Sequence, residues 1–242
     1  MRLLFLGNSH TYYNDMPFLA AELLRAGGDA VEVAMLTRGG QSLAGHLQNE
    51  QTRFNLLYGG WDLCLAQEVT SEFPPQEDYL RGVEAVKALC DAGGCRLALY
   101  MNFESPRDTP PLSAMRPSVL AAAERFRLPV ARAGEAFARA AQSCPDIDLY
   151  GPDRHHASPA GSYLVALSVR RLWPGRARPA RAHRLWRQAR ARPAQRSGRG
   201  PAGRRAVSAR RPLTQMPPRL ALGTAQGAFL CFGAYTSRTK AW

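Results

Sequence analysis

The fold of this chain is decided by a stretch near its start, Arg2-Leu3-Leu4-Phe5-Leu6-Gly7-Asn8-Ser9-His10-Thr11. Its first half is apolar and ends at a glycine, a pattern typical of a strand buried in a parallel sheet. Gly7 and Asn8 then predict a sharp turn, and a helical pattern follows from Phe18. Ser9 is therefore expected at the carboxyl end of the first strand, where open α/β sheets bind their ligands. The alternative for a lone serine at this place is a cap of the turn or helix.

Short apolar runs alternate with amphipathic segments along the next part of the chain. The sequence predicts further strands at 31–36, 61–67, 96–102 and 128–131, with helices at 43–57, 77–90, 111–126 and 133–143 and a closing helix from residue 159. This alternation is typical of a parallel sheet with helices on both faces. We predict a three-layer α/β/α sandwich with the flavodoxin-like strand order 2-1-3-4-5 and right-handed crossovers.

Polar or small residues follow four of the predicted strands, at the point where each strand ends. They are Ser9, Gly40, Gln67 and Asn102. In a parallel sheet of this kind the carboxyl ends of the strands share one edge. The sequence therefore predicts a site along that edge.

A serine nucleophile needs a base beside it and a group that orients the base. Asp153 and His156 stand three residues apart in a loop bordered by glycine and proline, so one turn can present both side chains. Asp153 would then hold the tautomer of His156. His155 is the rival base, and a solvated loop is the alternative for the pair. His10 adjoins Ser9, but adjacent side chains rarely face each other.

These segments, in this order, resemble the four blocks of the SGNH (GDSL-like) hydrolases. The blocks are residues 7–11 after the first strand, Gly40 after the second, a polar residue after the third, and Asp153-x-x-His156 before the last helix. The resemblance covers residues 2–170 and looks closest to proteins that open with a Gly-Asn-Ser-x-Thr block. It implies an SGNH-type fold and a serine esterase or acetylesterase, acting on a small-molecule or carbohydrate ester such as an O-acetyl group. Ser9 would be the nucleophile, His156 the base and Asp153 its orienting partner.

The resemblance also implies an oxyanion hole made from the backbone N–H groups of Ser9 and Gly40 together with a side-chain amide. Many members have Gly-x-Asn-Asp in the third block, whereas this chain has Ala66-Gln67-Glu68. A glutamine amide can donate the same hydrogen bond from one methylene further out. Asn102 is the rival donor, and a strand-end residue bonded to a loop is the alternative for Gln67.

The sequence shows no motif of other classes of catalytic, cofactor-binding or metal-binding sites. It contains no Gly-x-Ser-x-Gly, His-Glu-x-x-His, P-loop, dinucleotide fingerprint or zinc-type Cys/His cluster. His155 and His156 have only Asp153 as a nearby carboxylate, so we expect no metal and no cofactor. The five cysteines form no CxxC pair, no signal-peptide core is present, and no apolar run approaches a membrane span. We expect a reduced, cytoplasmic protein without a membrane partner.

The charge of the chain divides it in two. Residues 1–168 hold 14 basic and 19 acidic side chains, whereas residues 169–242 hold 18 basic and no acidic ones. We predict a hydrolase domain at 1–170 and a basic Arg/Pro/Ala-rich tail at 171–242, poorly ordered or loosely packed. The tail could bind nucleic acid, could be solvated without a role, or could derive from a frameshift in a GC-rich gene, which we favour. The alternative function is a catalytically idle SGNH-like binding domain whose tail binds nucleic acid.

Overall fold

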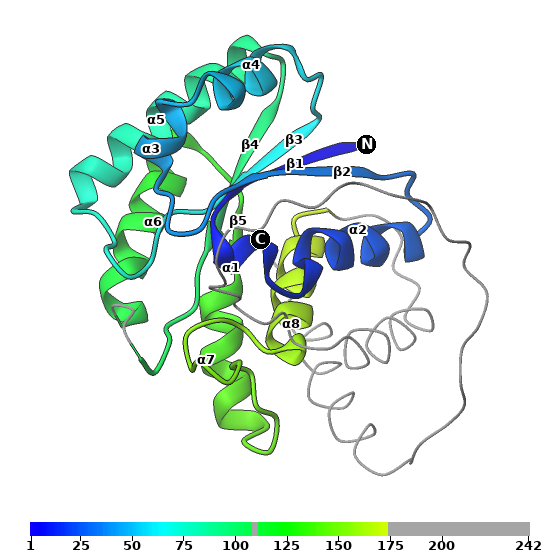
Figure 1. The fold of residues 1–242 in the computed structure, drawn as a ribbon, viewed down its shortest axis with the longest axis vertical. Helices are drawn as coiled ribbons and strands as arrows, with labels where there is room; N and C mark the ends of the chain where they lie inside the picture. Colours follow the sequence, from blue (N-terminus) through cyan, green and yellow to red (C-terminus); the bar gives the residue numbers. More distant parts are fainter. Residues whose placement is uncertain (108–110, 174–242) are drawn as a thin grey trace, which may run out of the picture. The chain divides into compact units, whose positions relative to one another are not determined.

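The computed structural model describes residues 1–107 and 111–173, which form a sheet with helices on both sides (Figure 1). The predicted tail at 171–242 lies outside the described residues except for its first three positions. The strands, all parallel, are β1 (Arg2–Gly7), β2 (Glu32–Thr37), β3 (Leu63–Ala66), β4 (Arg96–Met101) and β5 (Val130–Arg132). Their order in the sheet is β2-β1-β3-β4-β5, so the predicted fold class and strand order are confirmed.

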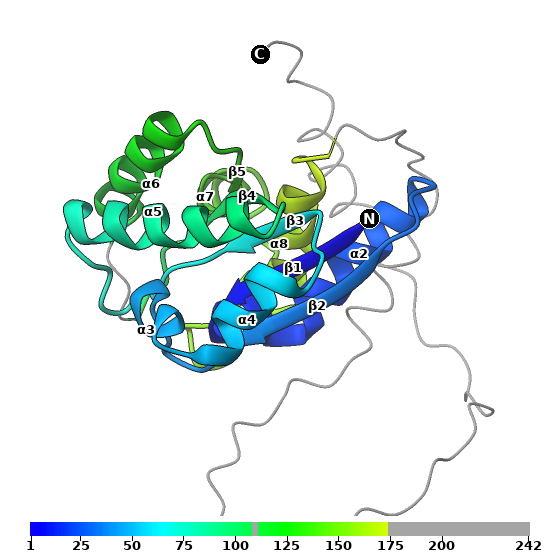
Figure 2. The ribbon, with the colours of Figure 1, turned by 90° about the horizontal axis from the view of Figure 1, so that it is seen from above.

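Helices cover the sheet in two groups. They are α1 (Ser9–Tyr12), the 3₁₀ turn η1 (Tyr13–Asp15), α2 (Met16–Ala26), α3 (Leu43–Leu47), α4 (Glu50–Tyr58), α5 (Gln76–Ala92), α6 (Leu112–Phe126), α7 (Ala133–Ser143) and α8 (Pro159–Arg170). In Figures 1 and 2, α3 to α6 lie on one side of the sheet, and α2, α7 and α8 lie on the other.

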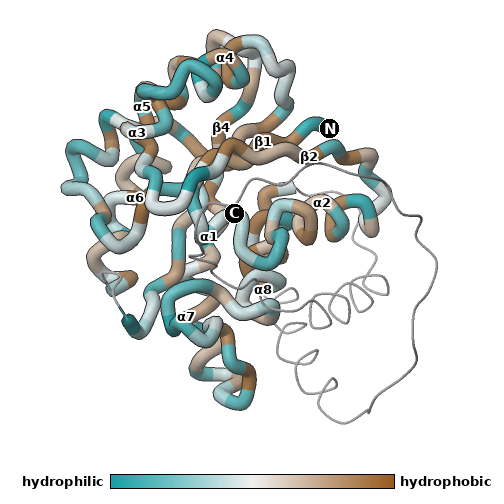
Figure 3. The backbone as a smooth tube through the Cα atoms, in the orientation of Figure 1, coloured by the Kyte–Doolittle hydropathy of each residue, from teal (hydrophilic) through white to brown (hydrophobic). Residues whose placement is uncertain are grey.

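The strand β1 lies inside the sheet because nearly every one of its side chains is apolar. Leu4 and Leu6 are at most 1% exposed and pack into a core with β3, β4 and α5. Each fully buried leucine of this kind stabilises the fold by about 1.5–3 kcal/mol. In Figure 3 the strands form the continuous hydrophobic segments, whereas the helices alternate in hydropathy. This burial holds the end of β1, and with it Ser9, in a rigid frame.

Two parts of the fold differ from the sequence prediction. The single helix expected at 43–57 is broken into α3 and α4, because Asn49 has an extended backbone and its side chain caps α4 by accepting from the Gln51 N–H. The turn expected after Gly7 contains the short helix α1, which starts at Ser9 itself.

The end of the described region is the helix α8, which Ser158 caps by accepting from the Gly161 N–H. Its residues from Ala160 to Val169 are all buried, and it packs against α2 and α7. The helix ends at Arg170, where the sequence predicts the end of the hydrolase domain. None of the helices in the described part of the chain has both the length and the apolar character needed to cross a bilayer.

Candidate active site

Ser9 is held at the first position of α1 by the residue before it. Asn8 is 1% exposed, and its side-chain oxygen accepts from the His10 N–H at 3.2 Å while its amide donates to the Gln41 carbonyl at 3.1 Å. A side chain at Gly7 would collide with Thr11 Oγ1 and with the Gln67 amide oxygen, so the strand must end in glycine. The sharp turn thus places Ser9 directly beyond the carboxyl end of β1.

The structure brings Ser9, His156 and Asp153 together in one hydrogen-bonded chain. His156 Nε2 lies 2.8 Å from Ser9 Oγ, and His156 Nδ1 lies 2.7 Å from Asp153 Oδ2. A carboxylate can only accept, so Nδ1 carries the proton of the neutral imidazole and Nε2 accepts from the serine hydroxyl. The two residues that the sequence places 147 positions apart therefore share a proton path.

The carboxylate of Asp153 is fixed and ionised. Its Oδ1 accepts from the backbone N–H groups of His155 at 3.1 Å and His156 at 3.0 Å. Burial alone would raise the pKa of Asp153, but the hydrogen bonds from the His156 ring and from these two N–H groups outweigh it and hold the pKa at about 2. Asp153 therefore presents a permanent negative charge to His156 at neutral pH.

The loop that carries Asp153 and His156 is held as a tight turn by its own backbone hydrogen bonds. The Gly151 N–H donates to the His156 carbonyl at 2.7 Å, and the Arg154 N–H donates to the Gly151 carbonyl at 2.9 Å. Arg154 has a φ of 56°, a left-handed conformation that costs a non-glycine residue about 1 kcal/mol or more. This tight turn lets Asp153 and His156 point the same way, as their spacing in the sequence predicts.

The two other histidines near the site, His10 and His155, contact each other. His10 is 4% exposed, and its Nε2 lies 3.2 Å from Nε2 of His155. Burial, and then the proximity of His155 and His156, lowers the pKa of His10 well below its ordinary value, so this imidazole is neutral. His155 Nδ1 lies 3.5 Å from Ser105 Oγ. No pattern in the sequence indicates this contact between His10 and His155, which lie 145 residues apart.

The amide of Gln67 is engaged within the protein. Gln67 is fully buried, and its oxygen accepts from the Asn8 N–H at 3.2 Å and from the Thr11 hydroxyl at 2.9 Å. Its NH₂ group donates to the Glu68 carbonyl. These three hydrogen bonds of the Gln67 side chain join the end of β3 to the start of α1, and none of them is with Ser9.

Asn102, the rival amide, is placed differently. It follows β4, is 6% exposed, and neither its amide nitrogen nor its oxygen has a hydrogen-bond partner among the described residues. A buried amide without partners costs about 1–3 kcal/mol, so such a group signals a missing ligand or a function. Gly40, the other proposed contributor, has a φ of 69°, which only glycine adopts readily.

The comparison with solved structures identifies the fold. A protein from Slackia heliotrinireducens that is assigned to the SGNH hydrolases matches with a TM-score of 0.60 and 29% sequence identity, over 71% of this chain and 97% of its own. The chain belongs to the SGNH (GDSL-like) hydrolase superfamily. No family profile matches the sequence, and no curated protein matches it.

Other solved structures are similar in fold at lower identity. A DUF4886 family protein from Bacteroides uniformis matches with a TM-score of 0.57 and 16% identity, over 78% of this chain and 93% of its own. The psychrotrophic esterase EstA from Pseudoalteromonas, in a structure inhibited by monoethylphosphonate, matches with a TM-score of 0.53 and 14% identity, over 69% of this chain and 93% of its own. At these identities the likeness concerns the fold alone.

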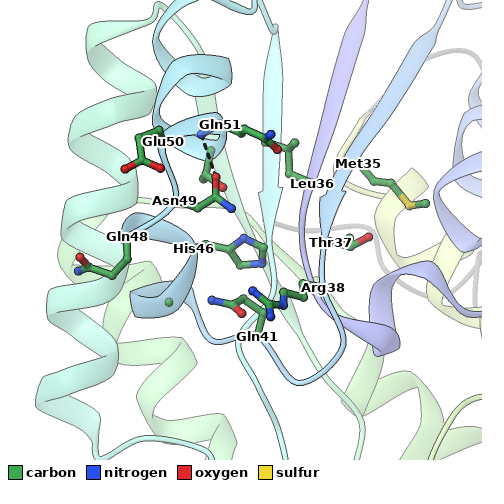
Figure 4. Close-up of a pocket in the computed structure, with 12 residues that line it drawn as sticks. Met35, Leu36, Thr37, Arg38, Gln41, His46, Gln48, Asn49, Glu50 and Gln51 are labelled. Atoms are coloured by element: carbon green, nitrogen blue, oxygen red, sulfur yellow. Dashed lines mark hydrogen bonds between the residues drawn. The ribbon is translucent and has the colours of Figure 1, made fainter. Parts of the chain in front are cut away.

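A separate cavity of about 420 Å³ lies beside the carboxyl end of β2 in this SGNH fold (Figure 4). Arg38 lines it from the end of the strand, and His46 and Asn49 line it from the side of α3 and α4. His46 also contacts the core of the fold, because its Nε2 lies 2.7 Å from the Gly7 carbonyl and links α3 to the end of β1. The cavity also reaches Gln41, whose carbonyl binds the side chain of the residue before Ser9.

Proposed function

We propose that this chain is a serine esterase of the SGNH type, in which Ser9 attacks the ester carbonyl. The observation that carries the proposal is the hydrogen-bonded chain from Ser9 Oγ through His156 to Asp153, with distances of 2.8 and 2.7 Å. A hydroxyl, a base and a carboxylate in this order are the parts that acyl transfer requires. The superfamily of the chain supports hydrolysis as the reaction class.

In the first half of the reaction, His156 Nε2 accepts the proton of Ser9 as Oγ bonds to the carbonyl carbon. The imidazolium that forms is stabilised by the ionised carboxylate of Asp153. His156 then returns the proton to the leaving alcohol, and an acyl group remains on Ser9. In the second half, His156 takes a proton from water, the hydroxide attacks the acyl carbon, and the acid leaves as Ser9 regains its proton.

The negative oxygen of the tetrahedral intermediate needs hydrogen-bond donors. The N–H of Ser9 stands at the start of α1, where helices leave N–H groups without intrahelical partners. We assign this N–H, the N–H of Gly40 and one side-chain amide to the oxyanion hole. The side-chain amide of Asn102, which has no hydrogen-bond partner within residues 1–107 and 111–173, is favoured over that of Gln67, whose oxygen and NH₂ group are both engaged. Each donor of this kind contributes about 2.7–4 kcal/mol to catalysis.

The substrate that we propose is a small or carbohydrate ester with a short acyl group such as acetyl. The ring of His156 is closely surrounded by the aromatic rings of Tyr13, His10 and His155, with centroids 3.8–5.1 Å away. This crowding on the side of the base favours a small leaving group or acyl group over a long lipid chain.

The decisive experiment is labelling with a fluorophosphonate, which bonds to an activated serine. We expect labelling of the wild-type chain and none of Ser9→Ala or His156→Ala. The matched control is Ser71→Ala, since Ser71 is an exposed serine outside the proposed triad. This variant should be labelled like the wild-type chain. If the wild-type chain is folded but does not react, the proposal is wrong and an idle binding domain takes its place. Turnover of p-nitrophenyl acetate by the same four proteins provides the second readout.

A further inference from the structure

Three imidazoles lie close together beside Ser9, although the proposed mechanism uses only one of them. His10, His155 and His156 each offer one ring nitrogen, and these three atoms all lie within 4.8 Å of one another. The ring centroids are 4.6 Å apart for His10 and His155, 5.1 Å for His10 and His156, and 4.5 Å for His155 and His156. Such a cluster has the composition of a His₃ metal centre.

The closest pair already has the spacing of two metal ligands. Nε2 of His10 lies 3.2 Å from Nε2 of His155. Two nitrogens bound to Zn²⁺ at 2.0–2.1 Å in a tetrahedral centre are about 3.3–3.4 Å apart. These two nitrogens therefore already have the separation that a shared metal ion requires, and binding would need a tilt of the rings that turns both lone pairs toward the ion.

The third imidazole has the outer contact that metal-binding histidines usually have. His156 donates from Nδ1 to Asp153 at 2.7 Å, which leaves Nε2 as its ligand atom and completes a carboxylate–histidine–metal arrangement. His155 likewise has Nδ1 3.5 Å from the Ser105 hydroxyl, so its Nε2 is directed at His10. Imidazole nitrogens of this kind suit Zn²⁺, Cu²⁺ and Ni²⁺ rather than Mg²⁺ or Ca²⁺.

We propose that His10, His155 and His156 form a binding site for Zn²⁺ or a similar divalent transition-metal ion, with water or Ser9 Oγ as the fourth ligand. A metal on His156 Nε2 occupies the lone pair that now accepts from Ser9. The bound ion therefore shuts off the base. This consequence rests on the proposed esterase function, whereas the binding itself does not.

The site differs from what the sequence predicts. Adjacent histidines with one carboxylate do not predict a metal centre, because the third ligand, His10, lies 145 residues away from His155. The helix α1 turns His10 away from Ser9 and into the space beside the loop at 151–158. The turn that places Ser9 beyond the end of β1 therefore also brings His10 next to His155 and His156.

The test measures metal binding directly on the full chain, by titration calorimetry with Zn²⁺ and by the visible absorption of added Co²⁺. We expect one ion per chain and the intense bands of tetrahedral Co²⁺. His155→Gln, at a partly exposed position, and His10→Asn should each weaken Zn²⁺ binding about 100-fold or more, since losing only an outer partner of a ligand typically costs 10–100-fold. His183→Asn is the control for a histidine outside the described residues and should bind like wild type.

Two further readouts separate this proposal from the proposed function. Ser9→Ala should still bind Zn²⁺, so loss of hydrolysis in that variant leaves the binding result intact. In the wild-type chain Zn²⁺ should inhibit ester hydrolysis reversibly, with recovery on addition of EDTA, and the inhibition should be weaker in His155→Gln. Absence of stoichiometric binding, or binding by His155→Gln as tight as by wild type, would overturn the site. If His10→Asn fails to fold, His155→Gln decides alone.

Discussion

The phenol ring of Tyr13 lies flat on the imidazole of His156, with ring centroids 3.8 Å apart and planes 4° apart. Tyr13 precedes two consecutive residues in the left-handed conformation, Asn14 with φ 53° and Asp15 with φ 54°. Strain of this kind persists only where surrounding contacts hold it, and it concentrates at functional sites. The strained segment therefore follows directly on the residue that packs against His156.

The stack predicts a role for Tyr13 in the acid–base behaviour of His156. An aromatic face favours the imidazolium by about 0.5–2 kcal/mol, so its loss should lower the kinetic pKa of the base and reduce kcat/KM several-fold to about 30-fold. We expect this of Tyr13→Leu, whereas Tyr13→Phe keeps the ring and should keep the pH profile. The measurement is kcat/KM for p-nitrophenyl acetate between pH 5 and 9. Superimposable profiles for the leucine and phenylalanine variants would show that the stack only fills space.

The side chain of Asn14 links the strained segment to the residues that follow His156. Its amide donates to the Ala157 carbonyl at 2.8 Å and to Ser162 Oγ at 2.9 Å. Asn14→Ala loses both bonds and keeps the unfavourable φ, so we expect the free energy of unfolding to fall by about 2–3 kcal/mol. Asn14→Gly loses the same bonds without the backbone strain. Its free energy of unfolding should therefore fall by about 1 kcal/mol less than that of Asn14→Ala. Urea unfolding of the three proteins measures both differences, and equal losses in the two variants would argue against stored strain.

Much of this arrangement follows from sequence patterns that act locally. The apolar runs that end in polar residues predict the parallel sheet, and a parallel sheet brings its carboxyl ends together, so Ser9 could be expected near the loop of His156. The spacing of Asp153 and His156 likewise sets their mutual orientation, because both lie in one tight turn. These features depend on periodicity and short-range geometry, which the sequence carries directly.

Other features depend on the direction of single side chains between distant segments. The pairing of His10 with His155 requires that α1 begin at Ser9, whereas the sequence predicts only a turn there. The use of Gln67 as a tie between β3 and α1 depends on its hydroxyl partner Thr11, which no pattern indicates. The stack of Tyr13 on the base requires left-handed backbone at the next two residues. Such details arise from tertiary packing and could not be predicted from the chain alone.

The low pKa of Asp153 makes the free energy of unfolding depend on pH in the acidic range. The carboxyl has an ordinary pKa of 3.8 in the unfolded chain and a pKa of about 2 in the fold. Its stabilisation is therefore complete above about pH 4–5 and is lost as the pH falls through 2. Because the side chain is 33% exposed, we expect only about 1–2 kcal/mol from this group. The free energy of unfolding of Asp153→Asn should fall less steeply than that of wild type between pH 5 and 2, and parallel curves would contradict the assignment.

The same Asp153→Asn variant should lose activity far more than stability at neutral pH. An amide can donate to His156 Nδ1 instead of accepting from it, which places the proton on Nε2 and removes the acceptor for the Ser9 hydroxyl. In the serine protease triad this change lowers kcat by about 10⁴-fold. We expect a loss of similar order in kcat for p-nitrophenyl acetate, with KM little changed. A variant that keeps more than about a tenth of wild-type kcat would exclude Asp153 from the reaction.

Experiments can distinguish Asn102 from Gln67 as the side-chain donor of the oxyanion hole, because only Gln67 has hydrogen-bond partners among the described residues. Asn102 has no partner among the described residues, so Asn102→Ala removes no bond within that part of the chain and should leave the free energy of unfolding within about 1 kcal/mol. If its amide donates to the oxyanion, kcat falls about 10²–10³-fold. Gln67→Ala instead leaves the Asn8 N–H and the Thr11 hydroxyl buried without their acceptor, so the free energy of unfolding should fall by about 2–4 kcal/mol. Unfolding and kcat measured on both variants decide between them, since an Asn102→Ala enzyme with undiminished kcat would leave the hole to backbone N–H groups or to Gln67.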